Sequence, residues 1–526
     1  MRRDFSSLAG RQFDLLICGG GIYGAWVAYD AALRGLRVAI VEQGDWACAT
    51  SSASSKLIHG GLRYLETYDF KLVRKALAER RRLLEAAPHR VWPLRFGVPV
   101  YADSRIGMLL LKAGLMLYDF LAGLSGANRA GSIMSHRHFG QKAFTERFPF
   151  LKGKGLKGGF TYGDAQTDDA RLVLELVAGA MEAGAVCVNY CQVTGYIENG
   201  GQVSGATLQD MLGHNIAQVS ARQIVNTSGQ WTAASEPGRG WCRLSKGIHL
   251  VMPALPTDEA LLLTARSDGR VFFMIPWYGM TLLGTTDSDY RGDPDHVTFK
   301  AEEAAYLLEE ANRYFNKAWT EQDVVGSYAG LRVMKRSDAA SPSAVSRDWE
   351  LKTASNGVHY SIGGKITSAR EDAACIVDVV CAQLGVGMAC QTMNRRFPWA
   401  PEQNYLEWSA EITARARQSG IDQECARWLA HRHGKRVEEV LRMVEHDAKL
   451  AERIMPDLPF IYADLLYAAG NEMAMHLPDL LRRRMPLLIL SRPTEMELNH
   501  IAVTVAPVMG WDQARIDREV EICLRQ

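Results

Sequence analysis

The sequence has almost no excess of charge of either sign, because 60 Lys and Arg residues stand against 59 Asp and Glu residues and leave a net charge of +1. Nucleic-acid binding usually requires a strongly basic face, so we expect no nucleic-acid partner. Apolar residues at 47% and charged residues at 23% exclude a mainly disordered chain. At about 150 residues per domain, the 526 residues predict two or more domains.

The sequence also lacks the cysteine spacing of a metal site. Ten cysteines are scattered along the chain, and none belongs to a C-x-x-C pair. Cys187 and Cys191 are four positions apart, but without a second such pair they make a poor zinc site. We therefore expect buried free thiols of a reducing cytosol and no metal centre. The two arginines near the N-terminus are not followed by an apolar stretch, so we expect no secretory signal.

No apolar run is both long and unbroken. Residues 106–124 (IGMLLLKAGLMLYDFLAGL) come near the length of a spanning helix, but Lys112 and Asp119 interrupt them. A spanning helix needs about 20 predominantly apolar residues. Two interpretations stay open for this segment: a helix inside the core, or a helix that lies on a membrane surface.

The clearest local pattern is a strand–helix–strand unit near the N-terminus. Residues 13–18 (FDLLIC) form a short apolar run that is typical of a buried parallel strand. Residues 25–34 (AWVAYDAALR) suit a helix, which Gly35 ends. Residues 36–41 (LRVAIV) predict a second strand, and Glu42 stands at its end.

A glycine motif joins the first strand to the helix. Gly19, Gly21 and Gly24 satisfy G-x-G-x-x-G in the full context that predicts a dinucleotide site. Gly19 permits the tight turn, Gly21 lets the backbone approach a pyrophosphate, and Gly24 lets helix and strand pack closely. The helix N-terminus presents N–H groups and a partial positive charge to phosphates, and Glu42 can accept hydrogen bonds from a ribose. The motif alone does not distinguish FAD from NAD.

The next segment, residues 49–65 (ATSSASSKLIHGGLRYL), is rich in serine. Beside a dinucleotide fold, such a stretch can supply hydroxyl and backbone N–H groups to a pyrophosphate or a flavin ring. It also holds His59, Arg63 and Tyr64 within six residues, next to paired glycines.

The rest of the chain mixes strands and helices before its texture changes. Residues 270–278 (RVFFMIPWY) and 280–284 (MTLLG) predict paired strands joined by a Gly-containing turn. Residues 357–362 (GVHYSI) predict another strand, after which Gly363-Gly364-Lys365 opens a helix. Beyond about Arg395 the chain is helix-rich and dense in Arg, Glu, Leu and Ala, which predicts a separate helical domain.

These patterns together resemble the FAD-dependent glycerol-3-phosphate dehydrogenases, the aerobic, quinone-linked branch of the amino-acid-oxidase-like flavoproteins. The resemblance runs from about Asp14 to Arg370. It rests on eight ordered blocks: GGGIYGAW, ATSSASSKLIHGGLRYLE, DDARLVL, KGIHLVMP, IPW with GTTD, YAGLR, SRDW and GGKIT. Chance matching of eight such blocks in order is negligible.

The resemblance implies an α/β fold with a Rossmann-type FAD-binding domain interleaved with an antiparallel-sheet substrate domain in residues 1–394. The substrate part is expected mainly at about residues 85–160 and 235–345, and the C-terminal helical domain at residues 395–526. The cofactor implied is tightly held, non-covalent FAD. The residues expected at FAD are Gly19, Gly21, Ile22, Gly24, Glu42, Thr50, Ser51, Ser52, Ser55, Lys56, His59, Gly60, Gly61, Gly229, Trp231, Gly363, Gly364, Lys365 and Ile366.

The substrate chemistry follows from charge combined with this resemblance. A phosphate monoester is a dianion that several guanidinium or ammonium donors hold best. The family blocks offer four such donors for a phosphate clamp: Arg63, Arg332, Arg347 and Lys365. Oxidation of a secondary alcohol also needs a base at its hydroxyl while hydride leaves carbon for flavin N5.

His249, in KGIHL, is the candidate for that base. Arg332 is a second catalytic candidate, as the group that holds the developing alkoxide, and Lys365 is expected beside the flavin. Tyr64 and Asp287 are expected to orient the substrate rather than to react.

The implied activity is oxidation of sn-glycerol 3-phosphate to dihydroxyacetone phosphate, with a membrane quinone as electron acceptor. We expect a cytoplasmic protein associated peripherally with the inner face of the cell membrane, and a homodimer is possible. Three alternatives stay open: a dehydrogenase of another phosphorylated polyol such as a tetritol phosphate, an oxygen-using glycerophosphate oxidase, and a flavin-binding protein that has lost catalysis.

Departures from the family pattern keep the alternatives open. Tyr23 stands where Asn is usual, Trp26 where a small residue is usual, and Gln230 where Pro is expected. Val333 and Met334 follow YAGLR in place of Pro-Leu. These changes affect packing beside the pyrophosphate and the loop after Arg332.

Overall fold

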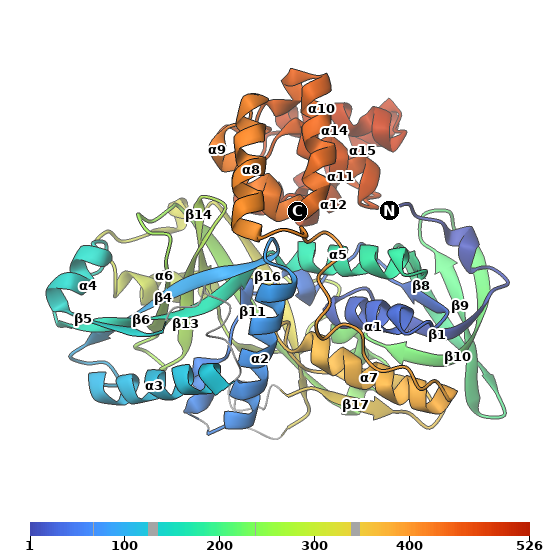
Figure 1. Ribbon diagram of the computed structural model, residues 1–526, viewed down its shortest axis with the longest axis horizontal. Coiled ribbons are helices and arrows are strands. Elements are labelled where there is room, and N and C mark those ends of the chain that lie inside the picture. Colours follow the sequence, from blue (N-terminus) through green and yellow to red (C-terminus); the bar gives the residue numbers. More distant parts are fainter. Residues whose placement is uncertain (67, 125–134, 237, 338–347, 526) are drawn as a thin grey trace.

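The computed structural model describes residues 1–66, 68–124, 135–236, 238–337 and 348–525. Two β-sheets lie side by side, and a group of helices from the C-terminal part of the chain stands above the boundary between them (Figure 1). This arrangement confirms the predicted α/β fold class with a C-terminal helical domain.

The first sheet is built around the N-terminal strand–helix–strand unit. Its strands follow the order β17-β18-β10-β1-β2-β7, and β9 joins β10 and β8 to the same sheet. The five parallel strands are β1 (Gln12–Cys18), β2 (Val38–Val41), β7 (Val186–Val188), β10 (Ile216–Asn226) and β18 (His359–Ile362). The antiparallel strands are β8 (Cys191–Asn199), β9 (Gln202–Asp210) and β17 (Glu350–Thr353).

Both faces of this sheet are covered, which explains its continuous apolar strands. On β1, Leu15 and Ile17 belong to one core cluster, whereas Leu16 and Cys18 belong to another on the opposite face. The helices of the first cluster are α1 (Ile22–Leu33), α5 (Asp169–Glu182) and α7 (Ala369–Leu384). Helix α1 contacts both of the others.

The second sheet has ten strands and is mainly antiparallel. Its order is β15-β11-β14-β13-β12-β4-β6-β3, with β16 paired to β11 and β5 paired to β6. Its strands are β3 (Leu57–Ile58), β4 (Val91–Tyr101), β5 (Arg137–Gly140), β6 (Leu156–Thr167), β11 (Cys242–Met252), β12 (Ala260–Thr264), β13 (Val271–Trp277), β14 (Met280–Gly284), β15 (Ser288–Tyr290) and β16 (Gly326–Lys335). The helices around it are α2 (Phe70–Ala86), α3 (Met108–Leu124), α4 (Gln141–Arg147) and α6 (Ala301–Asn312).

The C-terminal helices pack on one another and on the sheets below. They are α8 (Tyr405–Gln418), α9 (Gln423–His433), α10 (Val437–His446), α11 (Tyr462–Asn471), α12 (Leu477–Asp479), the π-helix η11 (Leu480–Arg484), α13 (Leu487–Leu490), α14 (Glu495–Met509) and α15 (Gln513–Leu524). Helix α5 contacts η11, and β16 contacts α13. The helical domain is therefore seated on α5, which covers the first sheet, and on β16 of the second sheet.

Most sequence-based elements agree with the structure, with one shift. The paired strands predicted at residues 270–284 are β13 and β14, which are antiparallel. The helix expected to open at Gly363 begins only at Ala369. The reason is that Gly363 and Gly364 have φ values of 74° and 94°, in the left-handed region, and a turn follows them. The exact division into domains stays a prediction.

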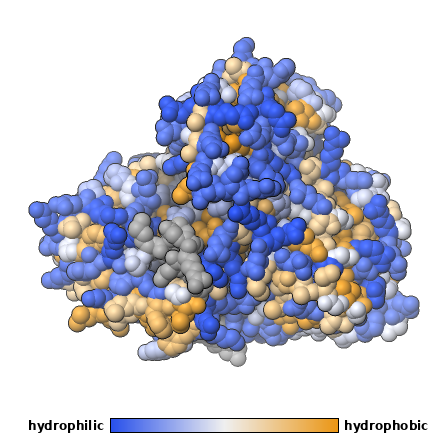
Figure 2. All heavy atoms as spheres, viewed as in Figure 1, coloured by the Kyte–Doolittle hydropathy of each residue, from blue (hydrophilic) through white to orange (hydrophobic). Residues whose placement is uncertain are grey.

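The apolar segment at residues 106–124 forms α3, which lies at the surface. Leu115 and Tyr118 are buried, whereas Leu109 is 86% exposed and Phe120 is 62% exposed. In the space-filling view, apolar residues gather along the lower left edge, where the ribbon diagram places α3 (Figure 2). The internal-core interpretation is therefore wrong. Among the helices that the structure describes, none is long and apolar enough to cross a membrane.

All ten cysteines are free thiols. Six of them are buried, as expected, but Cys375 is exposed and three others are partly exposed.

Candidate active site

A cavity of about 930 Å³ lies where the two sheets meet. It reaches the upper end of the size range of small-molecule and cofactor sites. Gly21, Thr227 and Gly363, which line it, each follow the carboxyl end of a parallel strand, β1, β10 and β18 respectively. Ligands of open α/β sheets bind at this edge.

The glycine turn at one end of the cavity fits a dinucleotide. Gly19 has a φ of 115°, and a Cβ on Gly24 would lie 1.9 Å from the carbonyl oxygen of Gly19. Gly21 has no side chain to cap the N-terminus of α1, and the first N–H of the helix, on Ile22, donates to Ser51 Oγ at the cavity wall. The observed backbone thus has the close helix–strand approach that a pyrophosphate needs, with the helix N-terminus at the cavity.

Glu42 lies at the end of β2 and is tied to the same turn. Its carboxylate accepts hydrogen bonds from Gly20 N at 2.6 Å and from Gly44 N at 2.9 Å. Burial raises the pKa of Glu42. The carboxylate therefore has a fixed position at the edge of the cavity, as a ribose-binding group requires.

The serine-rich segment contributes hydroxyl groups along the cavity wall. In η2 (Thr50–Ser52), Thr50 Oγ1 donates to the carbonyl oxygen of Leu331 at 2.6 Å, and Ser51 Oγ accepts from Ile22 N at 2.9 Å. Ser52 does not line the cavity, and its Oγ donates to Ala49 O. This segment therefore joins the glycine turn to β16.

Three residues of the expected cofactor set support the cavity from behind its wall. Lys56 is 2% exposed, and its Nζ donates to the Asp169 carboxylate at 2.6 Å. Gly60 and Gly61 do not line the cavity either. A Cβ on Gly60 would lie 2.3 Å from the Tyr118 hydroxyl, which shows that the chain passes too closely there for a larger residue.

His249 projects from β11 at the cavity and is 2% exposed. Its Nε2 lies 2.9 Å from Ser55 Oγ, and its ring stacks on Tyr328 with centroids 4.8 Å apart. Nδ1 has no hydrogen-bond partner within the described chain. Burial, reinforced by the charges of Arg332 and Lys56, lowers the pKa of His249 well below its usual range. The imidazole is therefore neutral and able to accept a proton.

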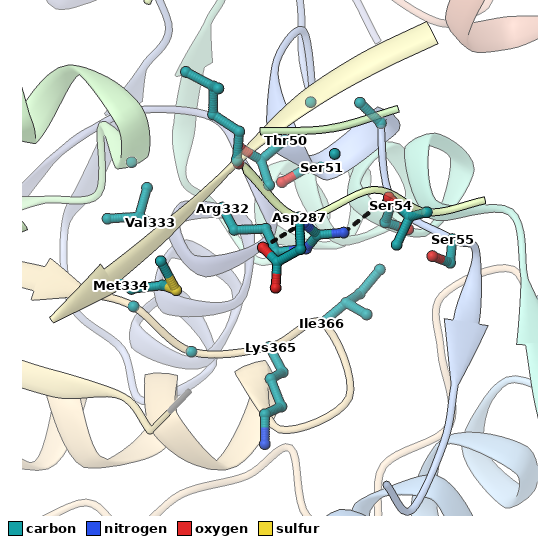
Figure 3. A pocket seen from close by; sticks show the side chains of 18 of the residues that line it. Thr50, Ser51, Ser54, Ser55, Asp287, Arg332, Val333, Met334, Lys365 and Ile366 are labelled. Atoms are coloured by element: carbon teal, nitrogen blue, oxygen red, sulfur yellow. Dashed lines mark hydrogen bonds and ion pairs between the residues drawn. The ribbon is translucent and has the colours of Figure 1, made fainter. Parts of the chain in front are cut away.

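Arg332 lies on β16, in register with Ser245 of β11. Its guanidinium donates to Thr285 Oγ1 at 3.0 Å and lies 3.3 Å from Asp287 Oδ1. Figure 3 shows the Arg332 and Asp287 side chains turned toward one another in the cavity. Asp287 also accepts a hydrogen bond from Ser245. Asp287 thus orients the guanidinium, while Arg332 remains 23% exposed.

Lys365 lies on the opposite wall, and its side chain extends away from Arg332 and Asp287 (Figure 3). Its Nζ stands 4.0 Å from the centroid of the Tyr64 ring, and the Arg63 guanidinium stands 5.2 Å from the same ring. These three groups form a second cationic region of the cavity. Arg347, the fourth donor of the expected clamp, lies outside the described residues.

Tyr23, which departs from the family pattern, holds the turn before Lys365. The Tyr23 hydroxyl accepts from Lys365 N at 3.0 Å and donates to the Asp372 carboxylate at 2.7 Å. A Cβ on Gly364 would lie 1.7 Å from the same hydroxyl. Tyr23 therefore needs glycine at position 364.

Two other departures from the family pattern, Gln230 and Trp26, contact different parts of the molecule. Gln230 donates to Pro294 O at 2.6 Å, and its neighbour Trp231 donates to Asp295 at 2.6 Å beside the cavity. Trp26 packs against Phe397, with ring centroids 5.4 Å apart. Trp26 therefore contributes to the core contact with the segment between α7 and α8, in which Phe397 lies.

Sequence reasoning missed Arg270 as a cavity residue. It lines the cavity, and its guanidinium donates to Asp287 O at 2.8 Å. Its position at the start of a strand-forming run gave no functional signal, because only the pairing of β13 with β14 brings it to Asp287. Thr285, directly after β14, was also missed, because only the pairing of β14 and β16 with β11 brings it to Arg332. Ile22, His59, Gly229 and Ile366 line the cavity as expected from the sequence.

Comparison with known proteins agrees with this architecture. Residues 14–370 match the family of FAD dependent oxidoreductases, and residues 390–516 match the C-terminal domain of alpha-glycerophosphate oxidase. A glycerol-3-phosphate dehydrogenase of Synechocystis is 34% identical over 545 residues, which cover 99% of this chain and 97% of the relative. The aerobic glycerol-3-phosphate dehydrogenase of Bacillus subtilis is 34% identical over 500 residues, covering 92% and 88%.

The X-ray structure of the glycerol-3-phosphate dehydrogenase from Bacillus halodurans, complexed with FAD, is similar in fold. It aligns with a TM-score of 0.79 and 29% sequence identity, covering 98% of this chain and 95% of that chain. The resemblance inferred from the eight sequence blocks is thus confirmed. The chain belongs to the FAD-dependent glycerol-3-phosphate dehydrogenases, a family of FAD-dependent oxidoreductases, and its cofactor is FAD.

Proposed function

We propose that the protein oxidises sn-glycerol 3-phosphate to dihydroxyacetone phosphate. The observation that carries this proposal is the neutral, buried imidazole of His249 at the same cavity wall as the Arg332 guanidinium. The names of its full-length relatives support glycerol 3-phosphate as the substrate. When bound, FAD supplies the acceptor for the hydride that leaves the substrate carbon.

In the proposed mechanism, His249 takes the hydroxyl proton of the substrate. A substrate hydroxyl that replaces the Ser55 hydroxyl at Nε2 meets an imidazole whose burial disfavours its charged form. Arg332 holds the negative charge that develops on the same oxygen, and Asp287 keeps the guanidinium in place. The positive charge of Arg332 makes proton uptake by His249 less favourable, so the proton leaves the imidazole readily afterwards.

The phosphate dianion is held on the cationic side of the cavity. Arg63 and Lys365 flank Tyr64 there. A dianion between several fixed cations gains charge-assisted hydrogen bonds that a neutral polyol cannot form. We therefore expect the protein to require a phosphorylated substrate.

Anaerobic mixing of the FAD-loaded protein with phosphorylated polyols tests the substrate. Glycerol 3-phosphate should bleach the flavin absorbance, whereas unphosphorylated glycerol at the same concentration should not. Faster bleaching by a tetritol phosphate would make the longer polyol the substrate. No bleaching by any phosphorylated polyol would contradict the proposed activity and favour the loss of catalysis.

A membrane quinone is the proposed electron acceptor, because the cavity opens beside an apolar surface. Tyr68 and Arg105 line the cavity. Tyr68 lies just before α2 in the chain, and Arg105 lies just before α3. Reduced enzyme should reoxidise rapidly with a short-chain quinone and slowly with dissolved oxygen. Rapid oxygen consumption without quinone would instead identify a glycerophosphate oxidase.

The exposed face of α3 is the proposed contact with the inner face of the cell membrane. Leu109, Leu110 and Phe120 are each more than 60% exposed, and Tyr68 is 78% exposed nearby. An amphipathic surface of this kind buries apolar side chains among lipid headgroups. In flotation with anionic vesicles, the Leu109→Ser and Phe120→Ser double variant should lose most of its binding. Unchanged flotation would remove α3 from the membrane contact.

A further inference from the structure

The loop after β2, residues 43–48, connects the proposed FAD site with the C-terminal helical domain. Asp45 in this loop is 1% exposed. Arg484 of η11 donates to both of its carboxylate oxygens at 2.7 and 2.8 Å, and Arg483 donates to it at 2.5 Å. Burial opposes the ionisation of Asp45, but the two guanidinium groups outweigh it and lower the pKa to about 2. The loop therefore carries a buried charge that two arginines of the helical domain neutralise.

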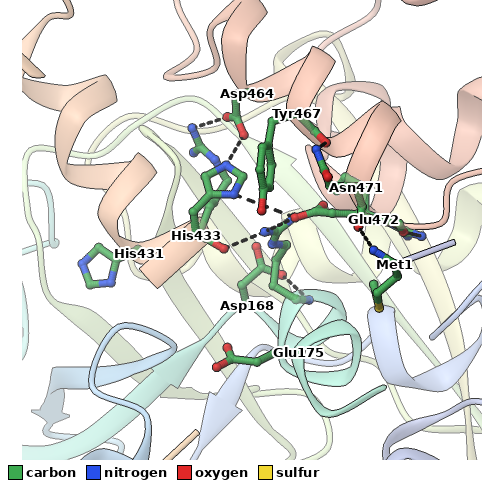
Figure 4. A network of polar contacts seen from close by, with 12 residues as sticks. Met1, Asp168, Glu175, His431, His433, Asp464, Tyr467, Asn471 and Glu472 are labelled. Carbon is green, nitrogen blue, oxygen red and sulfur yellow. Dashed lines mark hydrogen bonds and ion pairs between the residues drawn. The ribbon is translucent and has the colours of Figure 1, made fainter. Parts of the chain in front are cut away.

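The helical domain is itself ordered around these contacts. Arg484 also donates to the carbonyl oxygen of Glu472 at 2.9 Å, and Arg483 donates to Asp479 at 2.6 Å. The Glu472 carboxylate in turn pairs with Arg171 of α5, in the network that Figure 4 shows around Glu472. The two arginines are thus held by the helical domain itself as well as by Asp45.

The other side of the same loop contacts the glycine turn. A Cβ on Gly20 would lie 2.4 Å from the Trp46 indole, and Ala47 N donates to Gly20 O at 3.1 Å. The Trp46 Nε1 group lies 3.3 Å from Met473 Sδ of the helical domain. Trp46 is therefore held between the C-terminal helices and the phosphate-binding turn.

The loop also sets the position of Glu42. Gly44 N donates to Glu42 Oε1, while Gly20 N donates to Oε2. Ala47 has a φ of 63°, a conformation that a non-glycine residue keeps only where its surroundings fix it. Buried ion pairs add little to stability compared with apolar packing, but they can select a single arrangement of the chain.

We propose that the C-terminal helical domain shapes the FAD site through this loop, with Asp45, Trp46, Arg483 and Arg484 as positioning residues for Gly20 and Glu42. The inference rests on the assignment of the glycine turn and Glu42 to FAD. Without the Asp45 pair, the loop loses its defined position, and the turn and Glu42 bind the adenosine half of FAD less tightly. None of the four residues contacts the substrate region around His249 and Arg332, so the effect concerns FAD alone.

The test is the affinity of the apoprotein for FAD, measured by titration with flavin fluorescence. Asp45→Asn and Arg484→Gln should each raise the Kd for FAD at least tenfold. Because the two side chains act as one pair, the double variant should be little worse than either single variant. At saturating FAD, the KM for glycerol 3-phosphate should stay within twofold of the unmodified protein.

Asp464→Asn is the matched control. Asp464 pairs with Arg432 at 2.5 Å and with His433 at 2.6 Å, and its side chain is 1% exposed within the helical domain; the described contacts of Asp464 do not include Asp45, Arg483 or Arg484. It should lower the thermal stability comparably and leave the Kd for FAD unchanged. An equal loss of FAD affinity in Asp464→Asn would overturn the proposal, since any destabilisation would then suffice.

Two further measurements keep the proposal falsifiable. Glu42→Gln tests the assignment of Glu42 to the FAD site. If this variant keeps the FAD affinity of the unmodified protein, that assignment is wrong. If Glu42→Gln binds FAD weakly while Asp45→Asn binds it normally, only the positioning role of the loop is rejected. Hydrogen exchange on the unmodified protein needs no variant. By linkage, FAD added to apoprotein should slow exchange in residues 480–484. Unchanged exchange there would overturn the proposal even if the Asp45 variants do not fold.

Discussion

Two regions of this molecule are built from the same residue types, yet they have opposite properties. In the helical domain and at its contact with α5, Arg432 pairs with Asp464 and Arg171 pairs with Glu472, all at most 1% exposed (Figure 4). In the cavity, Arg332 is 23% exposed and lies 3.3 Å from its carboxylate partner. Residue type therefore does not separate structural charges from functional ones; burial and the geometry of pairing do.

The histidines show the same difference. His433, in α9 of the helical domain, contacts Asp464 at 2.6 Å, and burial lowers its pKa despite that carboxylate. His249 also has a lowered pKa from burial, but its cationic neighbour Arg332 adds to the effect rather than opposing it. His249 lines the cavity, where a bound substrate can reach it, whereas His433 is enclosed in the core against a buried carboxylate.

The largest expected effect is on the stability of the buried network. Glu175 accepts hydrogen bonds from His89, Arg90 and the Trp399 backbone, and Glu175→Ala leaves the Arg90 charge buried without its carboxylate. We expect the free energy of unfolding to fall by about 3–5 kcal/mol. Thermal unfolding measures it. Glu182→Ala, which removes a more exposed pair with Arg436, is the control and should lower the free energy of unfolding by less than about 1 kcal/mol. Equal losses in the two variants would contradict the distinction between buried and exposed charges.

The next effect concerns turnover in the cavity. Arg332→Ala should lower kcat/KM for glycerol 3-phosphate by about 100- to 1,000-fold, roughly 3 kcal/mol, because the developing alkoxide loses its cation. Its melting temperature should change little. Arg243→Ala serves as the control, since Arg243 on the neighbouring strand pairs with Asp289 outside the cavity. Full activity in Arg332→Ala would remove Arg332 from the catalytic groups.

A smaller effect is expected from acid. Burial lowers the pKa of His431 to about 3, so the unfolded state binds its proton first as the pH falls below 6.5. Stability from the neutral histidine is present above pH 6.5 and is lost progressively below it, by roughly 1 kcal/mol at pH 5.5 for this group. Thermal unfolding at pH 7.5 and 5.5 measures the loss. His431→Gln should reduce the difference between the two pH values; an unaltered difference would assign it to other groups.

The smallest expected effect is at the surface of α3. Lys112→Glu should weaken partitioning to anionic vesicles by about 1 kcal/mol for the lost basic residue. Cosedimentation at low and high salt measures it, and the loss should shrink at high salt. Lys142→Glu on α4 is the matched control, because Lys142 is also exposed but lies on a different helix. Equal binding by both variants would argue against docking through α3.

The predictable part of the fold came from short-range patterns. The β1–α1–β2 unit was predictable because buried parallel strands require apolar runs and the pyrophosphate turn requires glycine. The start of α7 was not, since two glycines in the left-handed region and the Tyr23 contact delay the helix. For α3, the pattern of apolar residues could not show which of them would pack against the core and which would stay exposed.

The candidate site was predictable only as far as local motifs reached. Arg270 was missed because strand pairing brings it to Asp287, and Thr285 was missed because strand pairing brings it to Arg332. The link between Asp45 and Arg484 spans 439 positions and had no local signature.

The sequence by itself determined the family, the FAD turn and the alternation of strands and helices, because these depend on residues close together in the chain. Only the tertiary structure decided which of many arginines, carboxylates and histidines face the cavity and which neutralise one another in the core. The physical reason is that the free energy of a charge depends on its distance to water and to its partners, and the fold sets those distances.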